Sequence, residues 1–367
     1  MGLFSHAPKK EIRIVVDIAA DSVGGAYIAQ TGTLPPVIHH SVRVPIVIGG
    51  EGEVRALETS LTGVIRSLVE QGAPAVRRVE GTARPERVLV AIAAPWQKTR
   101  ARVEHVVRDD GRELVFTKGV MEQAVARSVT GTKEHLLTEE IVAGVLLNGY
   151  ETSMPFGKRA RYADLAILSS AIRDDIAHKV HAMVTEAFHT HAVRLLSALP
   201  VAYAVLRDVF PHEQDFLIQA ISDASVDMAL IKQGLPYDVQ SVTASLRPLL
   251  AATRAMADTT SSLALDATRA SAEADWVSAL MLGLRDIRSR HPLPRTVFVI
   301  AAPGEREVAK KLLDAPALRA LWLSDKPLAI VPVLPSHLSS YVSVRGTAEA
   351  DLPLALLALY ARNEHGG

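Results

Sequence analysis

The chain has 367 residues, of which 49% are hydrophobic and 22% are charged, so two or three packed subdomains with sizeable cores are expected. Lysine plus arginine and aspartate plus glutamate both number 40, which excludes a global basic field for nucleic acid or an anionic membrane. The absence of cysteine excludes disulfides, thiolate catalysis and cysteine-ligated zinc.

The two ends of the chain carry no membrane signal. No apolar run approaches the roughly 20 residues that span a bilayer. The first ten residues place their charges after a very short apolar stretch, which disfavours a signal peptide, and His6 stands where a myristoylation signal needs Ser or Thr. The last residues, Asn363 to Gly367, form no amphipathic tail, so we expect a cytoplasmic protein without direct membrane insertion.

Strands and helices alternate along the chain. Apolar and β-branched runs predict strands at 12–18, 26–29, 42–48, 88–93, 99–107, 113–117, 141–147, 165–169, 216–221, 228–232, 296–301 and 328–333. Helical spacing of apolar residues predicts helices at 54–68, from about 120, and at 172–188, 204–209, 246–290, 308–313 and 352–361. Gly72 and Pro74 are expected to end the first helix. A strand-turn-strand pattern occurs twice, near Asp17 and near Asp223, which indicates a duplicated domain.

The first hairpin carries a motif. Its sequence, Val15-Val-Asp-Ile-Ala-Ala-Asp-Ser-Val-Gly-Gly25, resembles the first phosphate loop of the FtsA/PilM-type actin-like ATPases. Such a loop needs glycine for close backbone approach to phosphate, and an aspartate to organise Mg²⁺ and the attacking water. Asp17 and Ser22 match the family pattern, whereas Ala19 replaces its glycine and Gly24 stands where lysine is usual. The leader Met1-Gly-Leu-Phe looks more like PilM than FtsA.

The second hairpin, residues 217–234, is similar to the family's second phosphate loop. Asp227 and Gly234 match, but Ala220 replaces the leading aspartate and Ser222-Asp223 replaces a glycine pair. The added negative charge would cost about 4 kcal/mol against a phosphate at ~4 Å in an effective dielectric of ~20, unless Mg²⁺ intervenes.

A third segment and an insertion complete the resemblance. Residues 297–304 resemble the family's adenosine-binding turn, with Ala301 and Ala302 in place of glycine before Gly304. Residues 147–158, an Asn-Gly turn followed by Pro-x-Gly, look like a segment of the inserted FtsA subdomain.

The expected fold class is α/β: an actin-like (ribonuclease H-like) duplicated fold with an inserted α+β SHS2-type subdomain. The resemblance implies three parts: subdomain 1A at 1–85, 171–205 and 335–367; the inserted subdomain 1C at 86–170; and subdomain 2 at 206–334, with a reduced helical 2B at about 241–290.

The resemblance also implies site residues. Asp17 and Asp227 would organise water, and Asp17 would bind Mg²⁺, although both could instead be turn carboxylates that cap their hairpins. Nucleotide contacts are implied for Asp17, Ala19, Ala20, Ser22, Ser222, Asp223, Ala301, Ala302 and Gly304.

Partner contacts are expected in the inserted subdomain. Lys98, Arg100 and Arg102 alternate along one strand and share a face, which is either an interaction surface or a solvated one. Trp96 beside them is either a partner anchor or an ordinary buried residue. With Tyr150, the residues assigned to partner binding are Trp96, Lys98, Arg100 and Tyr150.

Two other groups have simple interpretations. His178, His181, His189 and His191 are close in sequence but lack a matching carboxylate motif, so a solvated helix end is favoured over a metal site. The stripe of Trp276, Leu280 and Leu284 is expected to be a packed helix face.

Three functions follow from the resemblance. The first is a cytoplasmic actin-like scaffold of the FtsA/PilM type, a pseudo-ATPase whose binding of Mg-ATP is weak or lost. It would be recruited to the inner face of the membrane by pilus or divisome proteins, in type IV pilus assembly or cell division. The second is an active Mg-ATP-dependent ATPase that self-associates into filaments. The third is a sugar-kinase-like transferase, for which the sequence offers no catalytic aspartate with a substrate pocket.

Overall fold

The computed structural model describes residues 10–48, 50, 52–108, 110–127, 135–258, 263–323, 326–346 and 348–363. The N-terminal leader, Gly49 and the last four residues, on which some of the sequence interpretations fall, lie outside the described residues. The chain forms two compact units: residues 1–97, 172–209 and 333–367, and residues 98–171 and 210–332.

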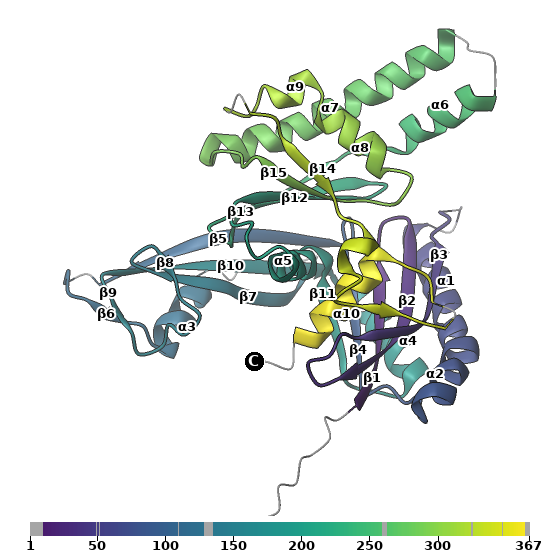
Figure 1. Cartoon of the computed structure of the whole chain (residues 1–367), viewed down its shortest axis with the longest axis horizontal. Helices are drawn as coiled ribbons and strands as arrows, with labels where there is room; N and C mark the ends of the chain where they lie inside the picture. The colour runs from purple at the N-terminus through teal and green to yellow at the C-terminus, as the bar shows by residue number, and fades with distance from the viewer. Residues whose placement is uncertain are drawn as a thin grey trace, which may run out of the picture. The chain divides into compact units, whose positions relative to one another are not determined.

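The first unit is built on a six-stranded sheet with the order β11-β4-β1-β2-β3-β17 (Figure 1). Its strands are β1 (Lys10–Ile18), β2 (Ser22–Thr31), β3 (Val37–Pro45), β4 (Arg87–Ile92), β11 (Val193–Ser197) and β17 (Ser343–Val344). The first three form an antiparallel meander, whereas β4 runs parallel to β1 and to β11.

Helices cover both faces of this sheet. They are α1 (Glu53–Ser67), α2 (Ala73–Glu80), α4 (Asp174–Phe188), α5 (Ala198–Val209) and α10 (Leu352–Asn363). Alternate β1 side chains, such as Ile14 and Val16, pack with Leu57 and Val64 of α1 in one apolar core. Helix α10 contacts β1 and β2, and the buried guanidinium of Arg13 donates a hydrogen bond to an α10 carbonyl. Asp17 lies four residues after Arg13 on β1, so both side chains are on the same face of the sheet.

The predicted end of the first helix was wrong. A π-helical turn (Leu68–Gly72) continues α1 into α2, and Pro74 lies in the first turn of α2. Proline has no N–H to donate to the preceding turn, and the π-helical turn directly before α2 is where the bonding of the helix departs from the regular pattern.

The second unit contains a five-stranded sheet with the order β14-β13-β12-β15-β16. Its strands are β12 (Phe216–Ile221), β13 (Ser225–Lys232), β14 (Leu235–Thr243), β15 (Thr296–Ile300) and β16 (Ala329–Pro332). Again a three-stranded antiparallel meander continues into two parallel strands, as in β3-β2-β1-β4-β11. The duplication predicted from the two hairpins is therefore present in the strand order of both sheets.

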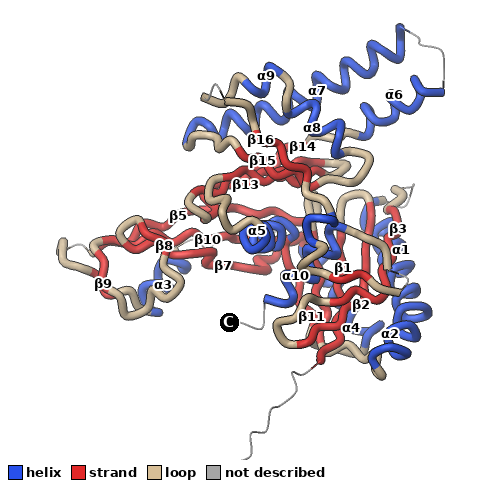
Figure 2. Tube along the Cα trace, in the orientation of Figure 1, coloured by secondary structure: helices blue, strands red, loops and turns tan. Residues whose placement is uncertain are grey.

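Four helices accompany this second sheet (Figure 2). They are α6 (Arg247–Asp258), α7 (Leu263–Arg290), α8 (Arg306–Leu313) and α9 (Pro316–Arg319). Trp276, Leu280 and Leu284 of α7 lie in the apolar core, as predicted. The helical region predicted at 246–290 is present as α6 and α7, whereas β14, which takes the residues up to 243, was not predicted.

The same unit holds a four-stranded sheet, order β5-β10-β7-β8, from the segment expected to be inserted. Its strands are β5 (Gln97–Val107), β10 (Tyr162–Arg173), β7 (His135–Leu147) and β8 (Tyr150–Glu151), with β6 (Leu114–Val115), β9 (Arg159–Ala160) and α3 (Lys118–Ala126) alongside. The predicted Asn148-Gly149 turn is confirmed, since both residues have positive φ, of 53° and 83°.

Candidate functional site

The two hairpins close in the same way. The N–H of Ala19 donates to the carbonyl of Ser22 at 2.9 Å, and the N–H of Ser222 donates to the carbonyl of Ser225 at 2.9 Å. If Ala19 and Ser222 are taken as equivalent positions, β1 corresponds to β12 and β2 corresponds to β13.

The acidic residues of the two hairpins lie on different strands of this shared frame. Asp17 on β1 is opposite Gly24 on β2, whereas Ala220 on β12 is opposite Asp227 on β13. Each half therefore has one carboxylate in this pair of opposite residues. It lies on the first strand of the hairpin in the first half and on the second strand in the second half.

The third strand completes each row. Gly24 is opposite Arg43 on β3, and Asp227 is opposite Ser241 on β14. The first row thus reads Asp-Gly-Arg and the second reads Ala-Asp-Ser, so the first half has a cation where the second has a hydroxyl.

Arg43 is the centre of an ion cluster in the first unit. Its Nη2 lies 2.9 Å from Asp17 Oδ2, its Nε lies 2.6 Å from Asp351 Oδ2, and its Nη1 lies 3.0 Å from Ser22 Oγ. Asp351 also accepts a hydrogen bond from the N–H of Leu354 at 3.0 Å, at the start of α10. The cluster therefore joins the end of β1, the last part of β3 and the start of α10.

The protonation of this cluster follows from burial and charge. Asp17 is 5% exposed, and burial raises its pKa above the usual value although the Arg43 guanidinium opposes the shift. Burial works against the charge on Arg43, but Asp17 and Asp351 outweigh it and raise the pKa of Arg43. The two carboxylates of Asp17 and Asp351 therefore share one guanidinium.

Gly24 gives Arg43 the space it needs. A Cβ at Gly24 would lie 2.6 Å from Arg43 Nη2, which is closer than nonbonded atoms approach. The absence of a side chain at Gly24 therefore admits a cation from the neighbouring strand.

The side chain of Trp96 forms a hydrogen bond with the loop that follows Asp17. The indole Nε1 donates to the carbonyl of Ala19 at 3.0 Å, and the side chain is 1% exposed. The alternative of Trp96 as a partner anchor is thereby wrong, because a buried tryptophan in the core of its own unit offers no surface to another molecule.

Asp227 in the second unit has no cation in its row. Ser241 Oγ donates to Asp227 Oδ1 at 2.5 Å, and the carboxylate is 7% exposed. Burial raises the pKa of Asp227 to about 6, although the hydrogen bond from Ser241 favours the charged form.

The second loop is bonded to itself. Ser222 Oγ accepts from the N–H of Ala224 at 3.4 Å and from the N–H of Ser225 at 3.1 Å. These are two of the backbone donors of the turn. The neighbouring Asp223 forms an ion pair with Arg247 at the start of α6, so its negative charge has a counterion.

The third segment follows β15, whose end lies beside the end of β12 because these strands are parallel neighbours. The buried Glu305 accepts a hydrogen bond from the N–H of Ala302 at 3.3 Å, and Arg306 Nε donates to the carbonyl of Ala301 at 3.0 Å. Gly304 has open space around its missing Cβ.

The residues predicted to contact nucleotide therefore divide into two groups. Asp17, Ala19, Ala20 and Ser22 belong to the first unit; Ser222, Asp223, Ala301, Ala302 and Gly304 belong to the second. Within each unit the strand topology gathers the group at one sheet edge, and their nucleotide roles stay predictions.

The residues predicted to contact partners do not form one patch. Lys98 and Arg100 are exposed on β5, whereas Tyr150 is 78% exposed on β8, at the opposite edge of the four-stranded sheet. Arg102 alternates with them on β5, as predicted, and donates to Glu104 and to the carbonyl of Val125.

The four histidines near α4 are exposed, and His178 lies 3.2 Å from the carboxylate of Asp174. Across the described ranges, no three His, Asp or Glu side chains are grouped so that they could hold a metal ion.

The sequence interpretation missed the partners of its own candidates. These are Arg43 for Asp17, with Asp351 as the second acceptor of Arg43, Ser241 for Asp227, Arg247 for Asp223 and Glu305 for Ala302. One signal was present: Arg43 is the single charged residue in the apolar run 42–48. A buried cation in a strand requires an anion nearby.

The repeated sheet, an antiparallel meander continued by two parallel strands, defines the actin-like ATPase fold, and comparison with solved structures agrees. A chain of the "PilM-PilN type IV pilus biogenesis complex" is 17% identical with a TM-score of 0.54, covering 95% of this chain and 98% of that one. The α/β actin-like part of the predicted fold class is confirmed by this match, whereas the SHS2 type of the inserted segment stays a prediction.

Other solved structures resemble the chain more weakly. A Bacteroides thetaiotaomicron protein with an actin-like ATPase fold and unknown function is 8% identical, with a TM-score of 0.45, covering 98% of this chain and 99% of that one. An Aquifex aeolicus PPX-GPPA enzyme is 9% identical, with a TM-score of 0.39 and coverage of 97% and 93%. No protein-family model and no curated protein matches the sequence.

Proposed function

We propose that the protein is an actin-like scaffold of the PilM type, acting in type IV pilus assembly through protein–protein contacts, with nucleotide binding weak or lost. The position of Arg43 is the observation that supports weak or lost nucleotide binding. It places the chain's own cation on Asp17, at the position where Mg²⁺ and phosphate would need the carboxylate.

The other nucleotide segments support the same conclusion. Backbone N–H groups of the second loop are bonded to Ser222, and that of Ala302 is bonded to the carboxylate of Glu305. A polyphosphate needs such donors for itself. The residues present therefore do not fit Mg-ATP unless these internal bonds break.

The pilus assignment rests on likeness in fold to one chain of a PilM–PilN complex. Cytoplasmic localisation belongs to the same proposal, with recruitment to the inner face of the membrane by an inner-membrane pilus protein. Within the described residues, no helix is long and apolar enough to cross a membrane.

We assign the partner contact to the tip of the inserted sheet. Tyr150 is 78% exposed, Met154 is 75% exposed and Phe156 is 55% exposed, and all three lie within seven residues of one turn-rich segment. Exposed aromatic and methionine side chains grouped in this way are typical of protein-binding surfaces.

Two experiments test the proposal. Thermal unfolding with and without millimolar Mg-ATP should give the same midpoint, since a ligand that does not bind cannot stabilise the folded state. A clear rise in the midpoint, or steady hydrolysis, would favour the alternative of an active filament-forming ATPase, for which the retained Asp17 and Asp227 speak.

The partner contact is tested in living cells. A photo-crosslinking amino acid at Tyr150 should capture an inner-membrane pilus assembly protein, identified by mass spectrometry. The same group at Val79, which is 65% exposed in the first unit, is the matched control. Capture of divisome proteins would move the assignment to cell division, and capture of neither class at Tyr150 would remove it.

A further inference from the structure

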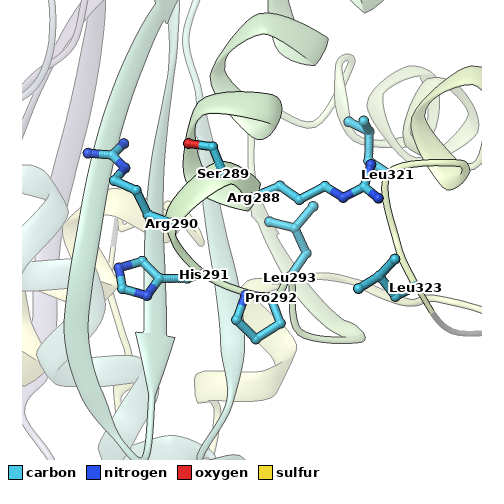
Figure 3. A pocket seen from close by; sticks show the side chains of 8 residues that line it. All are labelled: Arg288, Ser289, Arg290, His291, Pro292, Leu293, Leu321 and Leu323. Atoms are coloured by element: carbon cyan, nitrogen blue, oxygen red, sulfur yellow. The ribbon is translucent and has the colours of Figure 1, made fainter.

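A cavity of about 290 Å³ lies at the C-terminal end of α7 (Figure 3). Its lining includes neither Asp17 nor Asp227. Its walls come from the last turn of α7, the connection to β15 and the segment after α9. The lining residues are Arg288, Ser289, Arg290, His291, Pro292, Leu293, Leu321 and Leu323.

The walls of this cavity are fixed to each other. Trp322, between the two lining leucines, is 7% exposed and donates from its indole Nε1 to the carbonyl of Pro294 at 2.6 Å. Arg295 Nη2 donates to the carbonyl of Pro327 at 3.2 Å. A cavity whose walls are joined by such bonds needs little reordering when a ligand enters.

The interior is largely apolar. Leu321 is buried, Leu293 packs against the apolar core of the unit, and Leu323 is 83% exposed at the rim. Pro292 adds a further apolar surface. Small-molecule pockets usually enclose about 300–1,000 Å³, so this volume suits a single apolar side chain better than a nucleotide.

One cation serves the cavity. Arg290 points away from it and pairs with Asp238 at 3.0 Å and with Asp286 at 2.5 Å, while the His291 ring packs against Tyr237. Arg288 instead extends towards Leu321 in Figure 3, and within the described part of the chain no ion pair engages it. Its guanidinium is thus available to an incoming carboxylate.

We propose that this cavity is a docking site for a short peptide segment of a partner protein, in which an apolar side chain is flanked by a carboxylate. The apolar side chain enters between the leucines, and the carboxylate accepts hydrogen bonds from Arg288. Guanidinium–carboxylate pairs are short and bidentate, so this contact selects acidic segments over neutral ones. This site is independent of the pilus assignment.

The test uses the full chain with ¹³C-labelled leucine methyl groups and the peptide acetyl-Ser-Glu-Leu-Glu-Ser-amide. Methyl signals of Leu293, Leu321 and Leu323, assigned through single leucine-to-isoleucine variants, should shift on titration. Arg288→Gln should weaken binding about tenfold, because it removes a charge-assisted pair. Arg285→Gln, exposed on the same helix but outside the lining, should leave binding unchanged.

Two peptide controls separate the contributions. Replacing both glutamates of the peptide by glutamine should weaken binding to the wild type about as much as Arg288→Gln does, and replacing its leucine by serine should abolish the methyl shifts. No methyl shift at millimolar peptide would overturn the proposal. Equal binding of acidic and neutral peptides, or equal weakening by Arg285→Gln, would overturn it too. Leu323→Ser, at an exposed position, tests the apolar wall without endangering the fold.

Discussion

Gly24 and Asp227 occupy the same position in the two hairpins, each on the return strand and each opposite a residue of the strand before the turn. In the first half, the absent side chain admits the guanidinium of Arg43. In the second half, a carboxylate occupies the position and has a hydroxyl beside it. The equivalent buried row therefore holds an ion pair in the first half and a carboxylate bonded to a hydroxyl group in the second.

The first prediction concerns Arg43→Ala. Its loss leaves Asp17 buried beside Asp351 without their shared cation, so the free energy of unfolding should fall by about 3 kcal/mol. Urea unfolding followed by tryptophan fluorescence measures the change. Arg55→Ala, whose side chain is 66% exposed and 3.9 Å from Glu58, should change stability by less than about 0.5 kcal/mol. Similar effects of the two substitutions would contradict the proposed cluster.

The second prediction concerns Gly24→Ala. The new methyl group would displace Arg43 Nη2 from both carboxylates, at a cost of about 1–2 kcal/mol for the weakened charge-assisted bonds. In the Arg43→Ala background the same change should be neutral, because nothing remains to be displaced. A double-mutant cycle measures this coupling.

Gly25→Ala is the control for that cycle. A Cβ at Gly25 would lie 2.5 Å from Val64 Cγ1 and 3.0 Å from Leu68 Cδ1, which are core atoms unrelated to Arg43. Its cost of about 1–3 kcal/mol should therefore be the same in both backgrounds. An equal cost for Gly24→Ala in both backgrounds would show that Arg43 is not held where the structure has it.

The third prediction concerns pH. The pKa of Asp227 is raised from 3.8 to about 6 by burial, so the folded state binds its proton more tightly than the unfolded state does. This contribution to stability is complete below about pH 4 and is lost as the pH rises through about 6. The loss amounts to roughly 3 kcal/mol, at 1.36 kcal/mol for each pKa unit.

Asp227→Asn isolates this effect from other titrating groups. The free energy of unfolding of the wild type minus that of the variant should fall between pH 4 and pH 7 and stay level above that. Ser241→Ala removes the hydrogen bond that favours the charged carboxylate, so the fall should extend to higher pH. If the difference in the free energy of unfolding does not change with pH, the pKa of Asp227 is not raised by burial, and the prediction is wrong.

The fourth prediction concerns Trp96→Phe. The change removes the hydrogen bond to the carbonyl of Ala19 and should lower the free energy of unfolding by about 2 kcal/mol, while leaving crosslinking at Tyr150 unchanged. Trp276→Phe is the matched control. Trp276 is 2% exposed, and its indole N–H finds no acceptor among the described residues, so its substitution should cost less.

Much of the fold was readable from the sequence because apolar periodicity and turn residues report local structure. The strand at 216–221 was predicted to the residue, and so was the turn at Gln233-Gly234, where both residues have positive φ. Strand β14 was missed because Pro236 and Asp238 interrupt its apolar alternation. There, pairing with β13 outweighs local propensity.

The candidate site was readable only in part. The sequence identifies Asp17 and Asp227 as acidic residues in turns, but not what lies beside them. Arg43 reaches Asp17 because both residues are aligned with Gly24 of the strand between them. This alignment depends on the register of β2 and β3, which shifts between Tyr27 and Ile28. Asp351 is separated from Arg43 by 308 positions along the chain. Contacts of this kind depend on register and topology, which no local pattern encodes.

The first unit is assembled from both ends of the chain. Arg43 on β3 pairs with Asp351 before α10, and Arg13 on β1 donates to the carbonyl of Ala361 within it. Protein synthesis proceeds from the N-terminus, so strands β12 to β16 have been translated before Asp351 is added to the chain. The half that begins first is therefore completed only after the strands of the second half have been translated, and until then its sheet lacks β17 and the covering helix α10.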